Sequence, residues 1–311
     1  MPQITPILRA RRERRLTKQR VSADRTRNTF LSLGMIVSML IAMGAFGVMD
    51  AVIKLLSVDM PPMQIAALRG LVTLPLLGIY MWRRHSFHSI VKIKWPLQMA
   101  RGMLAIAMLW SFSVGIKSLA MTQAYTIFFI SPMLIAILAW PLLGERPSHV
   151  RWVALIVGLT GILIALRPST EGMVSLGGLA VLVAATCYAT SAVISRRLSR
   201  TDSTDSQVFW VMAFLSIGGT ALALPQWQAL SVSQWQLMPA LALSGFIGQL
   251  AITDAFKHGR AATVASFEYS ALAWAVSLDL LIWGVLPDAL TFVGAGVVIA
   301  TGLWLLRVDR H

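Results

Sequence analysis

Cysteine, charged residues and the common catalytic motifs are scarce in this chain. Cys187 is the single cysteine among 311 residues, so neither a disulfide framework nor a thiolate metal site can form within the chain. Charged residues make up 13% of the sequence, against 57% hydrophobic residues, which excludes an ordinary soluble domain. The sequence also lacks a phosphate-binding loop, a nucleophile elbow and a metal-ligand spacing of histidines. We therefore expect no cofactor, no metal site and no enzymatic activity.

What the sequence does contain is a series of long apolar stretches. Stretches of about 18 to 22 residues can cross a bilayer as helices. The predicted fold class is an all-α polytopic membrane protein with ten transmembrane helices. They are predicted at 30–56, 62–82, 96–117, 119–140, 150–166, 176–195, 206–224, 237–256, 261–283 and 289–306.

The positive charge lies at alternate ends of these stretches. The net charge is +14, and nine Lys or Arg residues fall between Arg9 and Arg27, ahead of the first stretch. Every second loop after it is also basic, whereas the loops between carry only Lys117 and Arg167. By the positive-inside rule, this pattern predicts an inner-membrane protein with both termini in the cytoplasm. Residues 1–28 form a predicted disordered basic tail, and the absence of aromatic residues before Phe30 argues against nucleic-acid binding.

Two segments about 140 residues apart resemble each other. Ala51-Val52-Ile53 corresponds to Ala192-Val193-Ile194, and the Gly144-Glu145-Arg146-Pro147 turn corresponds to Gly284-Val285-Leu286-Pro287. The chain is therefore predicted to hold two repeats, 29–168 and 169–307. If each repeat contains five helices, the two are inverted in the membrane, as in transporters that work by alternating access.

The segment 101–168 resembles the EamA domain of the drug/metabolite transporter superfamily. The resemblance rests on Arg101-Gly-Met-Leu, on 124–132, on Gly144-Glu145-Arg146 and on the glycines near Gly158. The second copy is similar through Phe267-Glu268-Tyr269 and the Gly284 turn, but it has Val285 where the family pattern has Glu. The resemblance implies an inner-membrane carrier with a central cavity. We therefore expect a secondary transporter of a small organic metabolite, such as an amino acid, an organic acid or a nucleotide-like vitamin.

Charged side chains within apolar spans are costly and need a reason. Asp50 precedes Lys54 by one helical turn, so these two can pair. Arg69 lies deep in the second span, either facing the cavity as an anion ligand or as a partner to Asp50, or in a structural ion pair. Arg101 begins the third span, either as an interfacial anchor or as a substrate ligand.

Glu268 is the candidate for proton coupling. A carboxylate buried in the membrane can take up and release a proton. Two other interpretations are open: an ion pair with Arg69 or Arg101, and a water-exposed position. Asp279 lies about three turns further along the same face, and we expect it to be solvated near the outer edge.

Aromatic residues supply candidate walls for a substrate cavity, although packing is the alternative for each of them. Pro132 removes a backbone hydrogen bond in mid-span and either frees a carbonyl group for substrate or simply kinks the helix. The aromatic candidates are Tyr125, Phe128, Tyr188, Trp210, Tyr269 and Trp274.

Two other function classes compete with transport. A non-transporting membrane scaffold needs no substrate site. A membrane-embedded lipid-modifying enzyme needs a catalytic pair, for which Asp254 and His258 are the only candidates. The expected partners are a small-molecule substrate and the lipid bilayer, with the chain as a monomer or a homodimer.

Overall fold

A computed structural model describes residues 33–57, 59–116, 118–119, 121–166, 175–284 and 289–308. The predicted tail 1–28, Lys117, Arg167, Val285 and the side chain of Asp279 lie outside what it describes. The described ranges contain helices and no strands, which confirms the all-α class. Within these ranges, nine helical segments are long and apolar enough to cross a membrane, and Ala289–Trp304 forms a shorter apolar helix.

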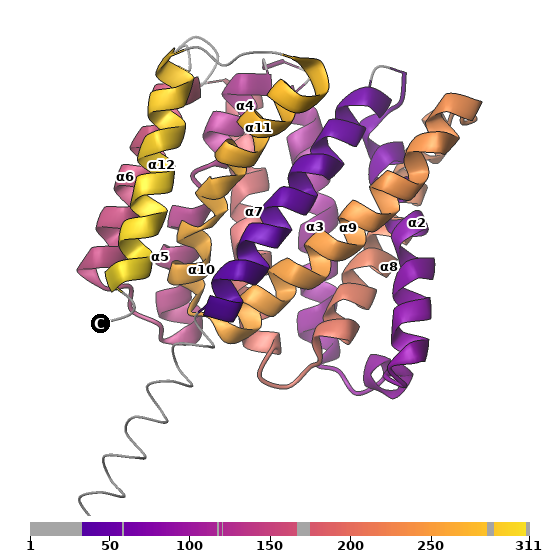
Figure 1. Ribbon diagram of the computed structural model, residues 1–311. Helices are drawn as coiled ribbons and strands as arrows, with labels where there is room; N and C mark the ends of the chain where they lie inside the picture. The colour runs from indigo at the N-terminus through magenta and orange to yellow at the C-terminus, as the bar shows by residue number, and fades with distance from the viewer. Residues whose placement is uncertain are drawn as a thin grey trace, which may run out of the picture.

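The helices follow the predicted spans closely (Figure 1). The first helix is Leu33–Leu56. The others are α2 Pro62–Arg83, α3 Trp95–Ile116, α4 Met121–Phe128, α5 Ser131–Leu143, α6 His149–Leu166, α7 Leu176–Leu198, α8 Thr204–Ala223, α9 Val232–His258, α10 Ala261–Ser266, α11 Ala271–Trp283 and α12 Ala289–Val308. Short 3₁₀ turns are η1 Phe87–Ile90, η2 Leu224–Gln226 and η3 Glu268–Ser270.

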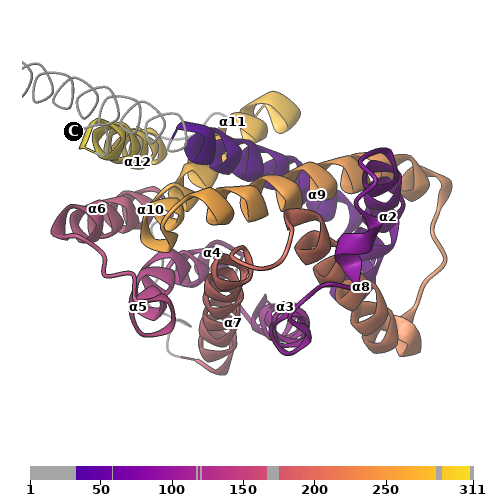
Figure 2. The same cartoon turned by 90° about the horizontal axis from the view of Figure 1, so that it is seen from below.

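The helices cross the molecule between two ends. We call the end at which the first helix starts, at the bottom of Figure 1, the near end, and the opposite one the far end. Seen from the near end, α6 and α12 lie together on one side and α2 and α8 on the other, with the first helix and α9 between them (Figure 2). Large apolar side chains cover the outer surface, for example Leu281 at 79% exposure and Ile217 at 71%. Lipid contact explains such exposure, because soluble proteins rarely leave extended apolar patches in water.

The fourth and ninth predicted spans are each interrupted. The fourth is divided into α4 and α5, with the buried Pro132 in the first turn of α5. Proline lacks the backbone N–H that would continue the helix. The ninth is divided into α10 and α11 by η3, which contains Glu268 and no proline. The kink expected at Pro132 is therefore a break, and a second break occurs where the sequence has no such marker.

The two broken spans end in the same way. Gly144 follows α5 with φ of 71°, and Gly284 follows α11 with φ of 64°. Both angles lie in the left-handed region, which glycine adopts without a steric penalty and which commonly ends a helix. The sequence correspondence between these two turns is thus matched by their backbone geometry.

A glycine seam joins α6 to α12. A methyl group placed on Gly161 would lie 3.0 Å from the carbonyl oxygen of Gly294, and one placed on Gly294 would meet the carbonyl oxygen of Gly161. Small residues allow such close approach of helices in a membrane. This seam joins a helix of the first predicted repeat to a helix of the second.

Candidate functional site

Asp50 and Arg69 meet towards the far end of the bundle. Asp50 lies in the last two turns of the first helix and Arg69 near the start of α2, so that their opposite charges are neighbours. The Arg69 guanidinium lies over the Phe46 ring at 5.5 Å, and its Nη2 donates to Gln249 Oε1 of α9 at 3.4 Å. Asp50 is exposed although its helix is apolar. Of the alternatives for Arg69, this arrangement agrees with a partnership with Asp50.

A row of half-buried aromatic side chains leads away from Asp50. Tyr125 of α4 is the second electrostatic neighbour of Asp50. Its ring lies 5.8 Å from Phe112, which lies 5.6 Å from Phe128, and Phe128 lies 5.5 Å from Tyr188 of α7. The row therefore crosses from the first copy to the second, and it brings together three of the predicted aromatic candidates.

Glu268 lies at the other end of that row. The Tyr188 hydroxyl donates to Glu268 Oε1 at 3.0 Å, and the glutamate is 5% exposed. The predicted water-exposed position is therefore wrong. Among the described residues neither Arg69 nor Arg101 forms an ion pair with Glu268, so the second interpretation does not hold in this conformation. The break in the ninth span places the carboxylate against α7.

Arg101 is buried between α3, α7 and α8. It is 4% exposed, and its Nη1 donates to Gln207 of α8, at 3.3 Å to the backbone oxygen and 3.2 Å to Oε1. Ser195 Oγ of α7 donates to the same Oε1 at 2.9 Å. An interfacial anchor would extend towards the head groups, so that alternative does not describe Arg101. Its electrostatic neighbour is Tyr188.

Three of the aromatic residues predicted to line a substrate cavity, and Pro132, lie outside the aromatic row. Trp210 donates from Nε1 to the Ile90 carbonyl oxygen at 3.0 Å, and its ring meets that of Trp95 edge to face. Tyr269 is 1% exposed, wedged against Gly158. Trp274 is 41% exposed and lies over Gly44. Each makes packing contacts, as the alternative interpretation held, and Pro132 is buried at the helix break.

Gln207 and Gln249 are site residues that sequence reasoning missed. Each bonds a buried arginine, from α8 and α9 respectively. Glutamine carries no charge, so it did not stand out in a search for charged residues. The usable signal was its polarity within an apolar span, since such residues mark functional or packing sites in membranes.

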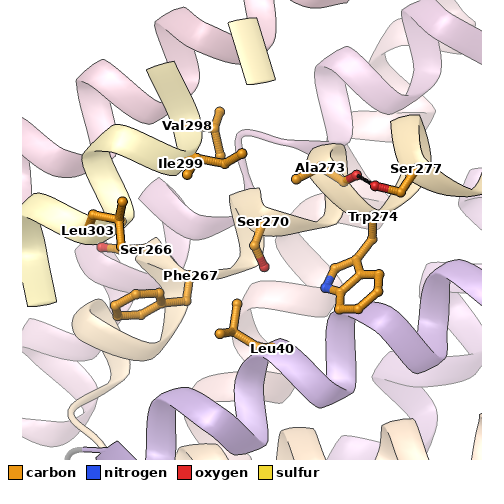
Figure 3. Close-up of a pocket in the computed structure, with 11 residues that line it drawn as sticks. Leu40, Ser266, Phe267, Ser270, Ala273, Trp274, Ser277, Val298, Ile299 and Leu303 are labelled. Carbon is orange, nitrogen blue, oxygen red and sulfur yellow. Dashed lines mark hydrogen bonds between the residues drawn. The ribbon is translucent and has the colours of Figure 1, made fainter. Parts of the chain in front are cut away.

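Two cavities open away from the aromatic row. One of about 310 Å³ lies between the first helix, α11 and α12, lined by Leu40, Ser270, Trp274 and apolar neighbours (Figure 3). A second of about 670 Å³ opens near the near end and is lined partly by Tyr80, Asp254 and Lys257.

The two residues predicted for a lipid-modifying enzyme lie together beside the second cavity. His258 Nδ1 is 3.2 Å from Asp254 Oδ1 on neighbouring turns of α9, and the other carboxylate oxygen accepts from Ser38 Oγ at 3.0 Å. Within the described ranges no cluster of three or more His, Cys, Asp or Glu residues is placed to hold a metal ion.

Glu145 joins three segments at the near end. Its Oε1 accepts from Arg196 Nε at 3.1 Å, at the end of α7, and its Oε2 accepts from the Ala261 backbone N–H at 2.9 Å, at the start of α10. Arg196 Nη1 in turn donates to the carbonyl oxygens of Phe256 and Lys257. A carboxylate of the first copy thus holds two segments of the second.

Comparison with known proteins agrees with this architecture. The model of the EamA-like transporter family matches residues 33–167 and again 175–307. The pseudopaline exporter of Pseudomonas aeruginosa is 27% identical over 286 residues, 90% of this chain and 98% of that protein. The riboflavin transporter of Vibrio cholerae is 24% identical over 84% of this chain and 89% of that one.

Two further similarities extend the comparison. The S-adenosylmethionine uptake transporter of Rickettsia conorii is 26% identical over 68% of this chain and 71% of its own length. One solved crystal structure superposes with a TM-score of 0.75 at 17% identity, over 91% of this chain and 99% of that one. Because the family model matches both halves, the chain belongs to the EamA-like transporter family.

Proposed function

We propose that the protein is a secondary transporter that carries a small organic compound across the membrane by alternating access. The observation that carries this proposal is the row from Asp50 and Arg69 to Tyr188 and Glu268. It sets charged and aromatic side chains from both copies in the interior of a membrane bundle. Such groups are costly in a membrane unless they serve a ligand or an ion. The relatives named as transporters of pseudopaline, riboflavin and S-adenosylmethionine support a compound of similar size.

The proposed topology has ten spans in two inverted five-helix copies, 29–168 and 169–307, with both termini on the cytoplasmic side of the inner membrane. The matched Gly144 and Gly284 turns and the two interrupted spans support the repeat. Rocking of the copies about the α6–α12 and α2–α8 contacts would then expose the row to each side in turn.

The proposed substrate contacts are Asp50, Arg69, Tyr125, Phe128 and Tyr188. The charged pair orients the polar groups of the compound, and the aromatic rings pack against its planar or apolar part. Glu268 is the proposed proton carrier, because it is buried, has no ion-pair partner among the described residues and accepts a hydrogen bond from Tyr188, which lines the row.

Flux measurements test the proposal directly. Metabolites that differ between a deletion strain, its medium and the parent strain identify candidate compounds, and counterflow in proteoliposomes then tests each one. We expect saturable flux that responds to an imposed pH gradient, and we expect Glu268→Gln to remove that response. Asp254→Asn, a change in an exposed carboxylate of α9, is the matched control and should keep it. No flux beside an active control carrier would favour a membrane scaffold instead.

A further inference from the structure

Arg101 and Gln207 hold hydrogen-bond donors that no acceptor in the described part of the chain satisfies. Arg101 Nε and Gln207 Nε2 are both buried without a hydrogen-bond partner, on side chains that are 4% and 0% exposed. The two residues touch, since Arg101 Nη1 bonds Gln207 Oε1 at 3.2 Å. Buried donors without acceptors are uncommon and costly in folded proteins. Two of them side by side indicate a place for an acceptor group.

The charge of Arg101 is also uncompensated. Among the described residues no carboxylate lies within ion-pair distance of its guanidinium. Its electrostatic neighbour, Tyr188, uses its hydroxyl proton to bond Glu268. Burying a charge without a partner lowers the stability of a fold, so Arg101 is expected to destabilise this protein when no ligand is bound. An anionic acceptor would satisfy the donors and the charge together.

We propose that Arg101 and Gln207 form a carboxylate-binding subsite for the transported compound, which rests on the proposed transport function. A guanidinium group presents planar, paired N–H donors that match the two oxygens of a carboxylate. Gln207 adds an N–H from the other copy, on α8. Tyr188, at the end of the aromatic row, connects the subsite with the remaining substrate contacts. The transported class is therefore a carboxylic acid with a planar or apolar body.

The test uses benzoate and benzamide, which share a ring but differ in charge. The midpoint of thermal unfolding of the purified full chain in detergent is measured against concentration of each, at constant ionic strength. We expect benzoate to raise the midpoint and benzamide to leave it unchanged. Arg101→Gln should abolish the response. Gln207→Glu should abolish it as well while raising the basal midpoint, because its carboxylate becomes the missing counter-ion.

Arg260→Gln is the control, because Arg260 is an exposed arginine that bonds the Arg146 carbonyl oxygen and belongs to no proposed substrate contact. We expect it to keep the benzoate response. Equal shifts with benzoate and benzamide, no shift with either, or a response that survives in Gln207→Glu would overturn the subsite. Proteoliposome flux distinguishes the failure of the subsite from the failure of the proposed function. If the protein transports a metabolite and benzoate does not inhibit that flux, the transport function is supported and the carboxylate subsite is refuted. Benzoate should inhibit flux about tenfold better than benzamide if the hydrogen bonds are to a charged group.

Discussion

Arg69 and Arg101 both lie within apolar helices and both bond a glutamine of the second copy, yet their surroundings differ. Arg69 has Asp50 as an electrostatic partner and the Phe46 ring beneath it, beside an exposed carboxylate. Arg101 has no carboxylate partner among the described residues and is almost completely enclosed. The first arginine thus has a carboxylate of the protein near its charge, although its Nε, like that of Arg101, is buried without a hydrogen-bond partner among the described residues. The second has no carboxylate neighbour among the described residues, which is why we propose it as a ligand of the transported compound.

Replacing Arg101 is expected to have the largest effect on transport. Arg101→Met removes the proposed carboxylate ligand, so flux should fall about a hundredfold, in keeping with charged hydrogen bonds. The same change removes an uncompensated buried charge, so the thermal unfolding midpoint should stay the same or rise. Proteoliposome flux and thermal unfolding check the two effects together. A fall in both would mean that Arg101 is a structural residue.

Breaking the other arginine's partnership should have a smaller effect. Asp50→Asn removes the counter-charge of Arg69, so we expect flux to fall about tenfold and the unfolding midpoint to drop. In the double variant Asp50→Asn with Arg69→Gln, the midpoint should recover while flux stays low, because no charge is then left unpaired. If the double variant is as unstable as the sum of the single variants, the two residues do not act as a pair.

The near-end contact of Glu145 allows a comparison of the two copies. Glu145→Ala removes two hydrogen bonds from a carboxylate that is 12% exposed, and we expect a loss of about 2 kcal/mol in the free energy of unfolding. Glu145→Gln keeps an acceptor for the Ala261 N–H and should lose about half as much. Denaturant unfolding in detergent measures both. Equal losses would mean that the contribution depends wholly on the charge and that a neutral acceptor adds nothing.

The smallest expected effect concerns the two glycine turns. Gly144→Ala and Gly284→Ala each place a side chain in the left-handed region, with open space around the added methyl group. We expect each to cost about 1 kcal/mol, from the backbone conformation alone. A methyl group on Gly161 meets a helix of the other copy at 3.0 Å, so Gly161→Ala serves as the contrasting variant and should reduce stability further. Unequal costs at the two turns would break the equivalence of the copies.

The spans and the repeat were readable from the sequence because hydrophobicity is a local property. Nearly every predicted stretch corresponds to a helix, including α6 and α12 at the ends of the two copies. The exception is the break at η3, where Glu268 interrupts the ninth span without a proline. Sequence periodicity does not contain this signal, since the partner of Glu268 at the break is Tyr188, 80 residues away on α7.

The partners of the charged residues were less predictable. The one-turn spacing of Asp50 and Lys54 predicted only a local pair, and the neighbours of Asp50 on α2 and α4 could not be read from it. Trp210 suggested a cavity wall, but it bonds the Ile90 carbonyl oxygen outside the row. Local spacing shows which residues share a helix face. Which helix packs against that face depends on how all the helices of the bundle pack together.

The sequence by itself determined that this chain is a helical membrane protein built from two similar halves, because the length and apolarity of a span depend on consecutive residues. Only the tertiary structure decided which polar groups meet. Arg69 meets Gln249, Tyr188 meets Glu268, and Arg101 meets Gln207. Each of these contacts joins helices far apart in the chain, and it exists only because the helices cross at that level of the bundle.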